Sequence, residues 1–178
     1  MKKITIILIL ISIPIFAQNK NFNLGVSVGL GSIKGNSPDV TAYGLNAFVG
    51  FTSVFTDYID FRLGFIYAQK VEQILPENRV GKYYPFIKVI YLKGVLKQPL
   101  SPKLFIEETL GLVYLNDRTF SDVNTWNYGA NFSLMLGLDL RKKNKGFTIG
   151  PVIDYGLTIN NSNASYIMFS LQTQYYFN

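Results

Sequence analysis

The stretch WNYGANFSLMLGLDL, residues 126–140, decides the fold because its two kinds of side chain alternate along its whole length. The even positions carry apolar or aromatic side chains, and the odd positions carry Asn, Gly, Ser and Asp with the single exception of Met135. A period of two is the pattern of a β-strand with two unlike faces. These 15 residues also exceed the length of an ordinary strand, which is about five or six residues.

The same alternation recurs along the chain and predicts eight antiparallel strands. It is clean at 22–30, 43–51, 59–68, 126–140, 147–160 and 167–177, and less regular near 86–97 and 104–115. Segments containing Gly, Pro, Asn, Asp and Ser, which favour turns, separate the strands at 31–40, 71–82, 116–125 and 160–165. Shorter turns are expected near 52–57, 98–103 and 141–146. This hairpin rhythm has no linker in it and predicts one domain.

The first 17 residues have the pattern of a secretory signal peptide. Lys2 and Lys3 precede an apolar run from Ile4 to Phe16, and Ala17 followed by Gln18 offers a cleavage point. The run has 13 residues, which is too short for a membrane-spanning helix of about 20. We therefore predict a signal peptide at 1–17, a single domain at 18–178, and export of the protein.

Composition excludes several classes of function. The chain has no Cys and no His, so it cannot form a disulfide scaffold, a thiolate or imidazole metal site, or a Ser–His nucleophile. A carboxylate hydrolase using Asp60, Asp139 or Asp154 stays open, but we interpret these residues as structural. The basic run Arg141, Lys142, Lys143 and Lys145 is interpreted as a solvated turn, because nucleic-acid binding needs a basic face interleaved with aromatics.

The make-up of the two faces favours a membrane. The polar face is rich in Gly, Ser and Asn rather than Lys and Glu, which suits the crowded inside of a narrow barrel. The apolar face is long enough for a transmembrane strand of about 9–11 residues. Aromatic side chains form two expected membrane-interface rims: Phe22, Phe51, Phe147, Tyr175 and Phe177 at one, and Tyr43, Tyr67, Trp126 and Tyr128 at the other. We predict an all-β, eight-stranded antiparallel up-and-down transmembrane β-barrel.

One pair of residues conflicts with this alternation. Glu107 and Glu108 are adjacent, so one of them must point toward the apolar side unless the register shifts. We expect either a β-bulge at this point or a position of Glu108 at the membrane interface.

Charged residues on the polar faces are candidates for a network inside the barrel: Asp60, Arg62, Lys88, Glu107, Asp139 and Asp154. Unpaired charge in a confined space is costly, so we interpret them as ion pairs that plug the lumen. The alternative is a path for small ions or solutes along the same groups. The glycine-rich run at Gly25, Gly29 and Gly31 lies within a strand and opens no helix, so it is not a nucleotide loop.

With its leader, its alternation and its aromatic last strand, the chain resembles the small eight-stranded outer-membrane barrels of the OmpA/OmpX type, in the broad porin-family group. The resemblance covers about residues 20–178. It implies a Gram-negative outer membrane, periplasmic termini, and outward-facing loops at 31–40, 71–82, 116–125 and 160–165. It also implies that Tyr175 and Phe177 form the signal read by the barrel-assembly machinery, although Asn178 and Gln172 depart from the usual ending.

These observations predict a non-enzymatic outer-membrane protein, structural or interacting through its extracellular loops. A narrow porin-like channel for small solutes or ions is the first alternative, and a soluble lipocalin-like binding barrel in the periplasm is the second. No cofactor, metal or nucleic acid is expected. The expected partners are outer-membrane lipid, the assembly machinery during insertion, and a protein or ligand at the loops.

Overall fold

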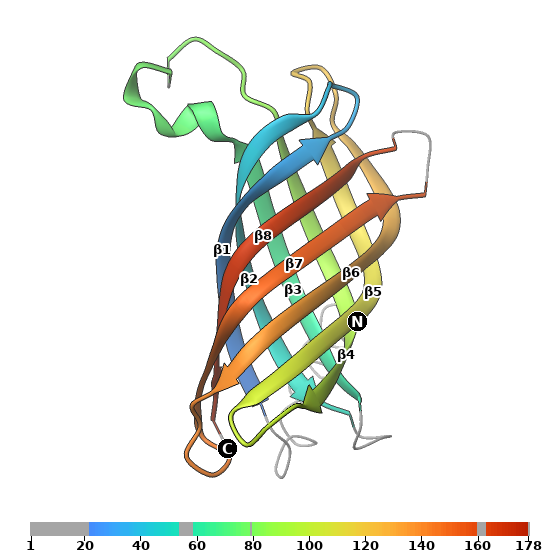
Figure 1. The fold of residues 1–178 in the computed structure, drawn as a ribbon. Helices are drawn as coiled ribbons and strands as arrows, with labels where there is room; N and C mark the ends of the chain where they lie inside the picture. Colours follow the sequence, from blue (N-terminus) through green and yellow to red (C-terminus); the bar gives the residue numbers. More distant parts are fainter. Residues whose placement is uncertain (1–21, 54–58, 79, 160–162, 178) are drawn as a thin grey trace, which may run out of the picture.

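The chain closes into a single antiparallel β-barrel of eight strands in sequential order (Figure 1). The computed structural model describes residues 22–53, 59–78, 80–159 and 163–177, so the proposed signal peptide lies outside the described residues. The strands are β1 (Phe22–Lys34), β2 (Val40–Thr52), β3 (Ile59–Lys70), β4 (Phe86–Pro99), β5 (Leu104–Arg118), β6 (Thr125–Asp139), β7 (Gly146–Thr158) and β8 (Ser165–Tyr176). Two short 3-10 helices, η1 (Val71–Ile74) and η2 (Pro76–Asn78), follow β3.

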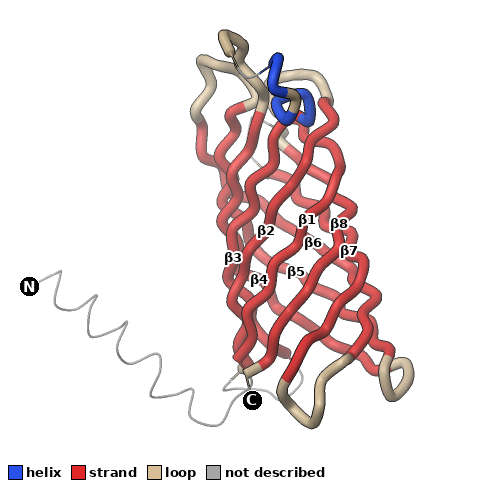
Figure 2. Tube along the Cα trace, turned by 90° about the vertical axis from the view of Figure 1, so that its left-hand side faces the viewer, coloured by secondary structure: helices blue, strands red, loops and turns tan. Residues whose placement is uncertain are grey.

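Pairing of β1 with β8 closes the barrel. Their register runs from Asn23 opposite Tyr176 to Lys34 opposite Ser165, so the start of the first strand and the end of the last lie together. We call this the lower end and the opposite one the upper end, as they stand in Figure 1. The tube in Figure 2 shows the strands tilted across the barrel, with both 3-10 helices at the upper end. Among the described residues, no helix has the length and apolar character needed to cross a membrane.

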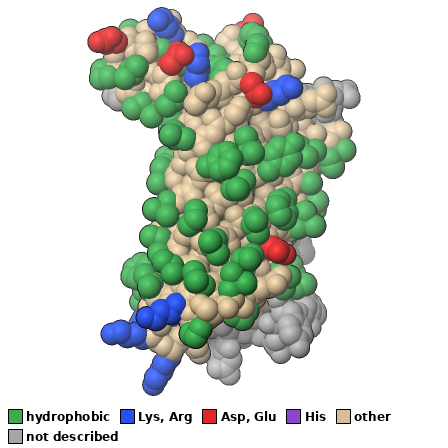
Figure 3. Space-filling view, viewed as in Figure 1, with side chains coloured by type: hydrophobic (Ala, Val, Ile, Leu, Met, Phe, Trp, Pro, Cys, Tyr) green, Lys and Arg blue, Asp and Glu red, His purple; other side chains and the backbone are tan. Residues whose placement is uncertain are grey.

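The predicted fold and the orientation of its faces are confirmed. Leu134, Leu136 and Leu138 point outward with exposed fractions of 41, 49 and 46%, whereas Asn131 points inward and is 1% exposed. Hydrophobic side chains cover the wall of the barrel between its ends (Figure 3). A patch of this extent is far larger than monomeric soluble proteins expose, so the outer surface is built for an apolar solvent.

The strands extend further at the upper end than the alternation predicts. Gly31, Ser32 and Ile33 continue β1, and β2 begins at Val40, so the connection between these strands shrinks to 35–39. Each strand has 12–15 residues, which is more than the 9–11 or so that cross a bilayer.

Of the two arrangements expected for Glu107 and Glu108, the β-bulge does not form. Register is continuous on both sides of β5, where Glu108 lies opposite Leu96 of β4 and Leu134 of β6. Glu107 therefore faces the lumen, and Glu108 occupies the outer face between two leucines. An unbroken ladder keeps the backbone N–H and C=O groups paired, whereas a bulge would have left some of them open on an apolar surface.

Pro151 marks an irregularity in the wall. The β6–β7 register pairs Met135 with Val152 and Leu138 with Ile149, and Pro151, which lacks an N–H donor, lies between those two points. Beside it, the backbone of Gly150 approaches β6 so closely that a Cβ atom would lie 2.0 Å from the carbonyl oxygen of Leu136. This close approach requires glycine.

We expect Gly150→Ala to lower the free energy of unfolding by about 1–3 kcal/mol, the usual cost of overpacking. The sign of this change in stability is informative, because a Gly→Ala substitution within a regular strand normally stabilises the protein. Gly94→Ala is the matched control, since its Cβ would find its nearest neighbour at 3.6 Å, and we expect a change within about 0.5 kcal/mol. Urea midpoints of the protein refolded in micelles measure both. Equal midpoints for the two variants would contradict the close approach.

Candidate functional site: the barrel lumen

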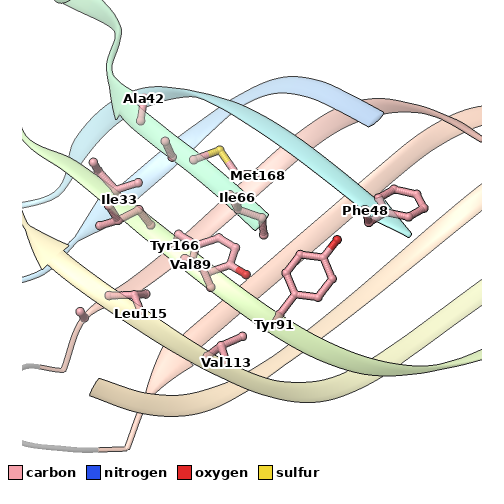
Figure 4. Close-up of a cluster of buried hydrophobic side chains, with 13 residues drawn as sticks. Ile33, Ala42, Phe48, Ile66, Val89, Tyr91, Val113, Leu115, Tyr166 and Met168 are labelled. Carbon is pink, nitrogen blue, oxygen red and sulfur yellow. The ribbon is translucent and has the colours of Figure 1, made fainter. Parts of the chain in front are cut away.

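The upper half of the lumen is filled by apolar side chains. A single buried cluster is contributed by β1, β2, β3, β4, β5 and β8 together with Ala164. Figure 4 shows its side chains, Ile33, Val89, Leu115 and Tyr166 among them, converging from different strands on the interior. Ile33, Ile87, Val89 and Leu115 are completely buried. Water and ions have little to bind in such a layer.

A buried ion pair lies below this layer. Lys93 of β4 reaches across the lumen to Asp154 of β7, with Nζ 2.8 Å from Oδ2. The ammonium group also sits 4.1 Å from the ring centre of Tyr91, and the Asn131 amide donates hydrogen bonds to Asp154 and, at 2.6 Å, to the Tyr166 hydroxyl. Lys93 is 2% exposed, so Asp154 provides the counter-charge that its burial requires.

A second buried pair occupies the next level down. The Arg62 guanidinium lies 2.9 Å from Glu107 Oε1, with the two side chains 4% and 2% exposed. The Gln174 amide donates to both oxygens of Glu107, at 3.3 and 3.1 Å, and Arg62 stacks 4.1 Å above the Phe48 ring centre. Multiple hydrogen bonds of this kind are what a buried ion pair needs to offset desolvation.

Four charged groups gather at the lower mouth. Arg141, in the turn after β6, holds the Asp139 carboxylate at 2.6 Å, and its hydrogen bond with that carboxylate raises the pKa of Arg141. Lys97 lies 3.8 Å from the same carboxylate and 3.6 Å from the ring centre of Phe105. Asp60 faces the same mouth, opposite Thr52 in the β2–β3 ladder.

The upper mouth is spanned by two connections from opposite sides of the barrel. Asp117 at the end of β5 is completely buried. Its carboxylate accepts hydrogen bonds from the backbone N–H and side-chain amide of Asn36, at 3.2 and 3.1 Å. It also accepts from the backbone N–H and hydroxyl of Thr119, at 2.9 and 2.7 Å. The 35–39 and 119–124 connections are thereby tied together above the apolar layer.

Most of the candidate lumen residues face inward, but Lys88 does not. Arg62 and Glu107 are brought together, Asp154 and Asp139 pair with other partners, and Asp60 stands near the mouth. The placement of Lys88 in the lumen is wrong. It shares its parity with Ile90 and Leu92, which are exposed on the outer wall, and its ammonium lies over the Phe86 ring at 5.5 Å.

Sequence reasoning missed the basic groups that complete the lumen: Lys93, Lys97 and Arg141. The parity of β4 contains the signal, because Lys93 and Lys97 alternate with the leucines at 92 and 96 while Lys88 shares their face. It also missed Gln172 and Gln174 as partners of Glu107. Nothing local identifies these glutamines, because their partner lies 65 and 67 positions away in the chain.

The aromatic residues expected at the membrane interfaces lie near the strand ends. Tyr114 of β5 stacks on Trp126 at 4.6 Å and contacts Tyr128 at 4.8 Å near the upper end. Tyr67 lies 5.8 Å from Phe86 at the same end, and Tyr43 is on the adjacent strand β2. At the lower end, Phe147, Tyr175 and Phe177 form a chain of edge contacts at 4.7 and 4.9 Å.

Comparison with solved structures finds the same architecture at low sequence identity. Neisserial surface protein A (NspA) gives a TM-score of 0.62 at 7% identity, with 86% of this chain and 96% of that chain covered. Ail, the attachment invasion locus protein of Yersinia pestis, gives 0.57 at 10% identity, covering 89% and 99%. The N-terminal barrel of Pseudomonas aeruginosa OprF gives 0.50 at 14%, covering 87% and 97%.

These neighbours establish that the chain has the fold of the small eight-stranded outer-membrane barrels. The Ail structure contains the heparin analogue sucrose octasulfate. No protein-family model matches the chain, and no protein of curated function matches its sequence.

The Arg62–Glu107 pair should show strong coupling in a double-mutant cycle. We expect Glu107→Gln to cost about 3–5 kcal/mol, because it leaves a buried guanidinium without its counter-charge. Arg62→Met should be similarly costly, and the Arg62→Met/Glu107→Gln double variant should lose less than the sum. Urea unfolding of the four proteins measures the cycle. Strict additivity would show that the two charges do not interact.

The two lysines of β4 provide a test of the corrected assignment. Lys93→Met should destabilise the barrel by about 3–5 kcal/mol, since Asp154 is then buried without a cation. Lys88→Met, an equivalent change on the outer face of the same strand, should alter stability by no more than about 0.5 kcal/mol. The same unfolding assay compares them, and a reversed order would restore Lys88 as the lumen residue.

Proposed function

We propose that the protein is a non-enzymatic outer-membrane β-barrel whose lumen is closed and whose activity resides in its extracellular surface. The observation that carries this proposal is the contrast between the two sides of the wall. On the outside, apolar side chains are exposed, and Leu110 and Leu112 reach exposed fractions of 67 and 72%. Inside, ion pairs and an apolar layer fill successive levels of the lumen.

The outer membrane is the compartment that fits this surface. A closed barrel has no sheet edge, so apart from the irregularity at Pro151 its strands pair their backbone groups within the wall, as the bilayer interior demands. The proposed leader at 1–17 would direct export, and Tyr175 and Phe177 would present the last strand to the assembly machinery. Both termini would then lie in the periplasm, with the connections at the upper end outside the cell.

Several observations favour a closed barrel over the alternative of a narrow channel. The Asp117 hydrogen bonds hold two connections over the upper mouth, and fully buried Ile33, Ile87 and Leu115 lie beneath them. Lower down, Lys93 and Arg62 are engaged by carboxylates from across the lumen. A permeating ion would have to break these pairs and cross the apolar layer, and both steps are costly.

The surface connections are the part left for interaction with a partner. Loops on a rigid scaffold are the usual carriers of binding function. Because side chains fill the lumen, the upper connections would present the polar groups that a partner outside the cell could reach. The titles of the neighbouring structures name a surface protein and an attachment protein, which agrees with a role at the surface.

Electrical recordings and gel mobility test the proposal together. We expect the refolded protein to migrate faster unheated than boiled, to float with lipid vesicles, and to leave a planar bilayer silent. Steady single-channel steps would overturn the closed lumen in favour of the channel. Recovery in the aqueous fraction without vesicles would favour the soluble periplasmic barrel instead.

A further inference from the structure

The connection between β3 and β4 forms a lobe that projects from the upper end of the barrel. This β3–β4 lobe comprises residues 71–78 and 80–85 and contains η1 and η2. Figure 1 shows it extending sideways beyond the wall, level with the upper strand ends, and Figure 2 shows the two 3-10 helices at the same height. It therefore overhangs the outside of the barrel rather than its mouth.

Hydrogen bonds fix the base of the lobe against the wall. The Lys70 N–H donates to the Pro85 carbonyl at 2.9 Å, and the Tyr43 hydroxyl on β2 donates to Gln73 at 3.1 Å. On the other side of the lobe, the Tyr83 hydroxyl donates to the carbonyl of Arg118 at the end of β5, at 2.5 Å. Attachment to β2 and β5 as well as to its own strands gives the lobe a set orientation.

The lobe exposes large apolar side chains despite its position above the wall. Ile74, Leu75, Val80 and Tyr83 are 49, 56, 84 and 40% exposed. The lobe also has charged groups, and its Glu72 pairs with Lys70 at the end of β3 at 3.0 Å. Figure 3 shows the charged side chains of the lobe mainly along its upper rim and the hydrophobic ones mainly below them. Such segregation is the property of elements that lie in a membrane interface.

The apolar surface of the lobe is continuous with the wall. Tyr83 contacts Phe86 with ring centres 6.3 Å apart, and Phe86 contacts Tyr67 at 5.8 Å. Phe86 and Tyr67 belong to strands β4 and β3, directly above the exposed leucine and phenylalanine side chains of the same strands. An aromatic bridge thus joins the lobe to the lipid-facing belt.

We propose that the β3–β4 lobe is a lipid-binding element that dips its apolar side into the outer leaflet beside the barrel. Leu75 and Val80 would lie at the level of the headgroup and acyl-chain boundary, with the charged side in water. The occupant is the lipid itself, because the contacts from Tyr83 through Phe86 to Tyr67 make the patch continuous with the apolar outer wall. This inference rests on the proposed membrane insertion of the barrel.

A tryptophan reporter at the lobe tests this directly. In a Trp126→Phe background, Leu75→Trp is refolded into phosphatidylcholine vesicles that carry lipids spin-labelled near the headgroup end of the acyl chain. We expect a blue-shifted emission, loss of intensity with the spin label, and protection from aqueous iodide. Lys82→Trp in the same background is the matched control at an exposed charged position of the lobe, and it should be quenched by iodide and not by the spin label.

Each other outcome overturns the proposal. Equal iodide quenching at the two positions would place the apolar side in water. Protection of Leu75→Trp that vanishes when the protein is diluted into excess lipid would identify a second copy of the chain as the occupant. Leu110→Trp, on the outer wall, distinguishes failure of the lobe proposal from failure of membrane insertion. If spin labels deep in the bilayer quench Leu110→Trp while Leu75→Trp is exposed to water, the barrel is inserted and only the lobe proposal is wrong.

Discussion

The barrel depends on the closure of its backbone hydrogen-bond ladder between β1 and β8. With twelve residue pairs recorded from Asn23–Tyr176 to Lys34–Ser165, the last strand leaves no open edge on either neighbour. An open edge on an apolar exterior would expose a row of unsatisfied N–H and C=O groups, each costing several kcal/mol in the hydrocarbon. Closure permits leucine and phenylalanine side chains to cover the outer face, and it also fixes the narrow bore into which the inward side chains must fit.

A closed barrel of eight strands has a narrow bore, which dictates the composition of its inner face. Small residues dominate β1, where Gly25, Ser27, Gly29 and Gly31 face inward. They leave room for larger side chains of the neighbouring strand β2. The ring of Phe48 occupies the space over Gly25, where a Cβ would lie 2.1 Å away. Small and large inward residues are therefore complementary between neighbouring strands, as Gly64 and Tyr91 also show.

Periodicity was sufficient to predict the architecture because it reports directly on the two faces. Residues 126–140 separate the two faces, the small polar make-up of one face then assigns it to the lumen, and the structure places Leu134 and Asn131 accordingly. The method failed where both faces of a strand carry the same kind of residue. In β4 apolar residues occupy each parity, so Lys88 could not be distinguished from Lys93 by its immediate neighbours, and the register of the complete strand was needed.

Some hydrogen-bond networks join residues that are distant in the sequence, so the sequence pattern could not predict them. The Asp117 site joins a connection 81 positions away, and its meaning appears only when the barrel brings opposite sides together. The partners of Glu107 on β8 are likewise set by closure. The adjacent pair Glu107–Glu108 was recognised as a conflict, but the structure resolves it by orienting one side chain inward and one outward, with the ladder intact.

The corrected lumen assignments also restore charge balance, which the sequence alone did not. The original candidates comprised four acids, Asp60, Glu107, Asp139 and Asp154, against the two bases Arg62 and Lys88. Replacing Lys88 by Lys93, Lys97 and Arg141 gives four of each sign below the apolar layer. Balanced charge at short range among these described side chains lowers the cost of burying each group. In the described part of the lumen, acids and bases from different strands are therefore held against one another, which ties the wall together from inside.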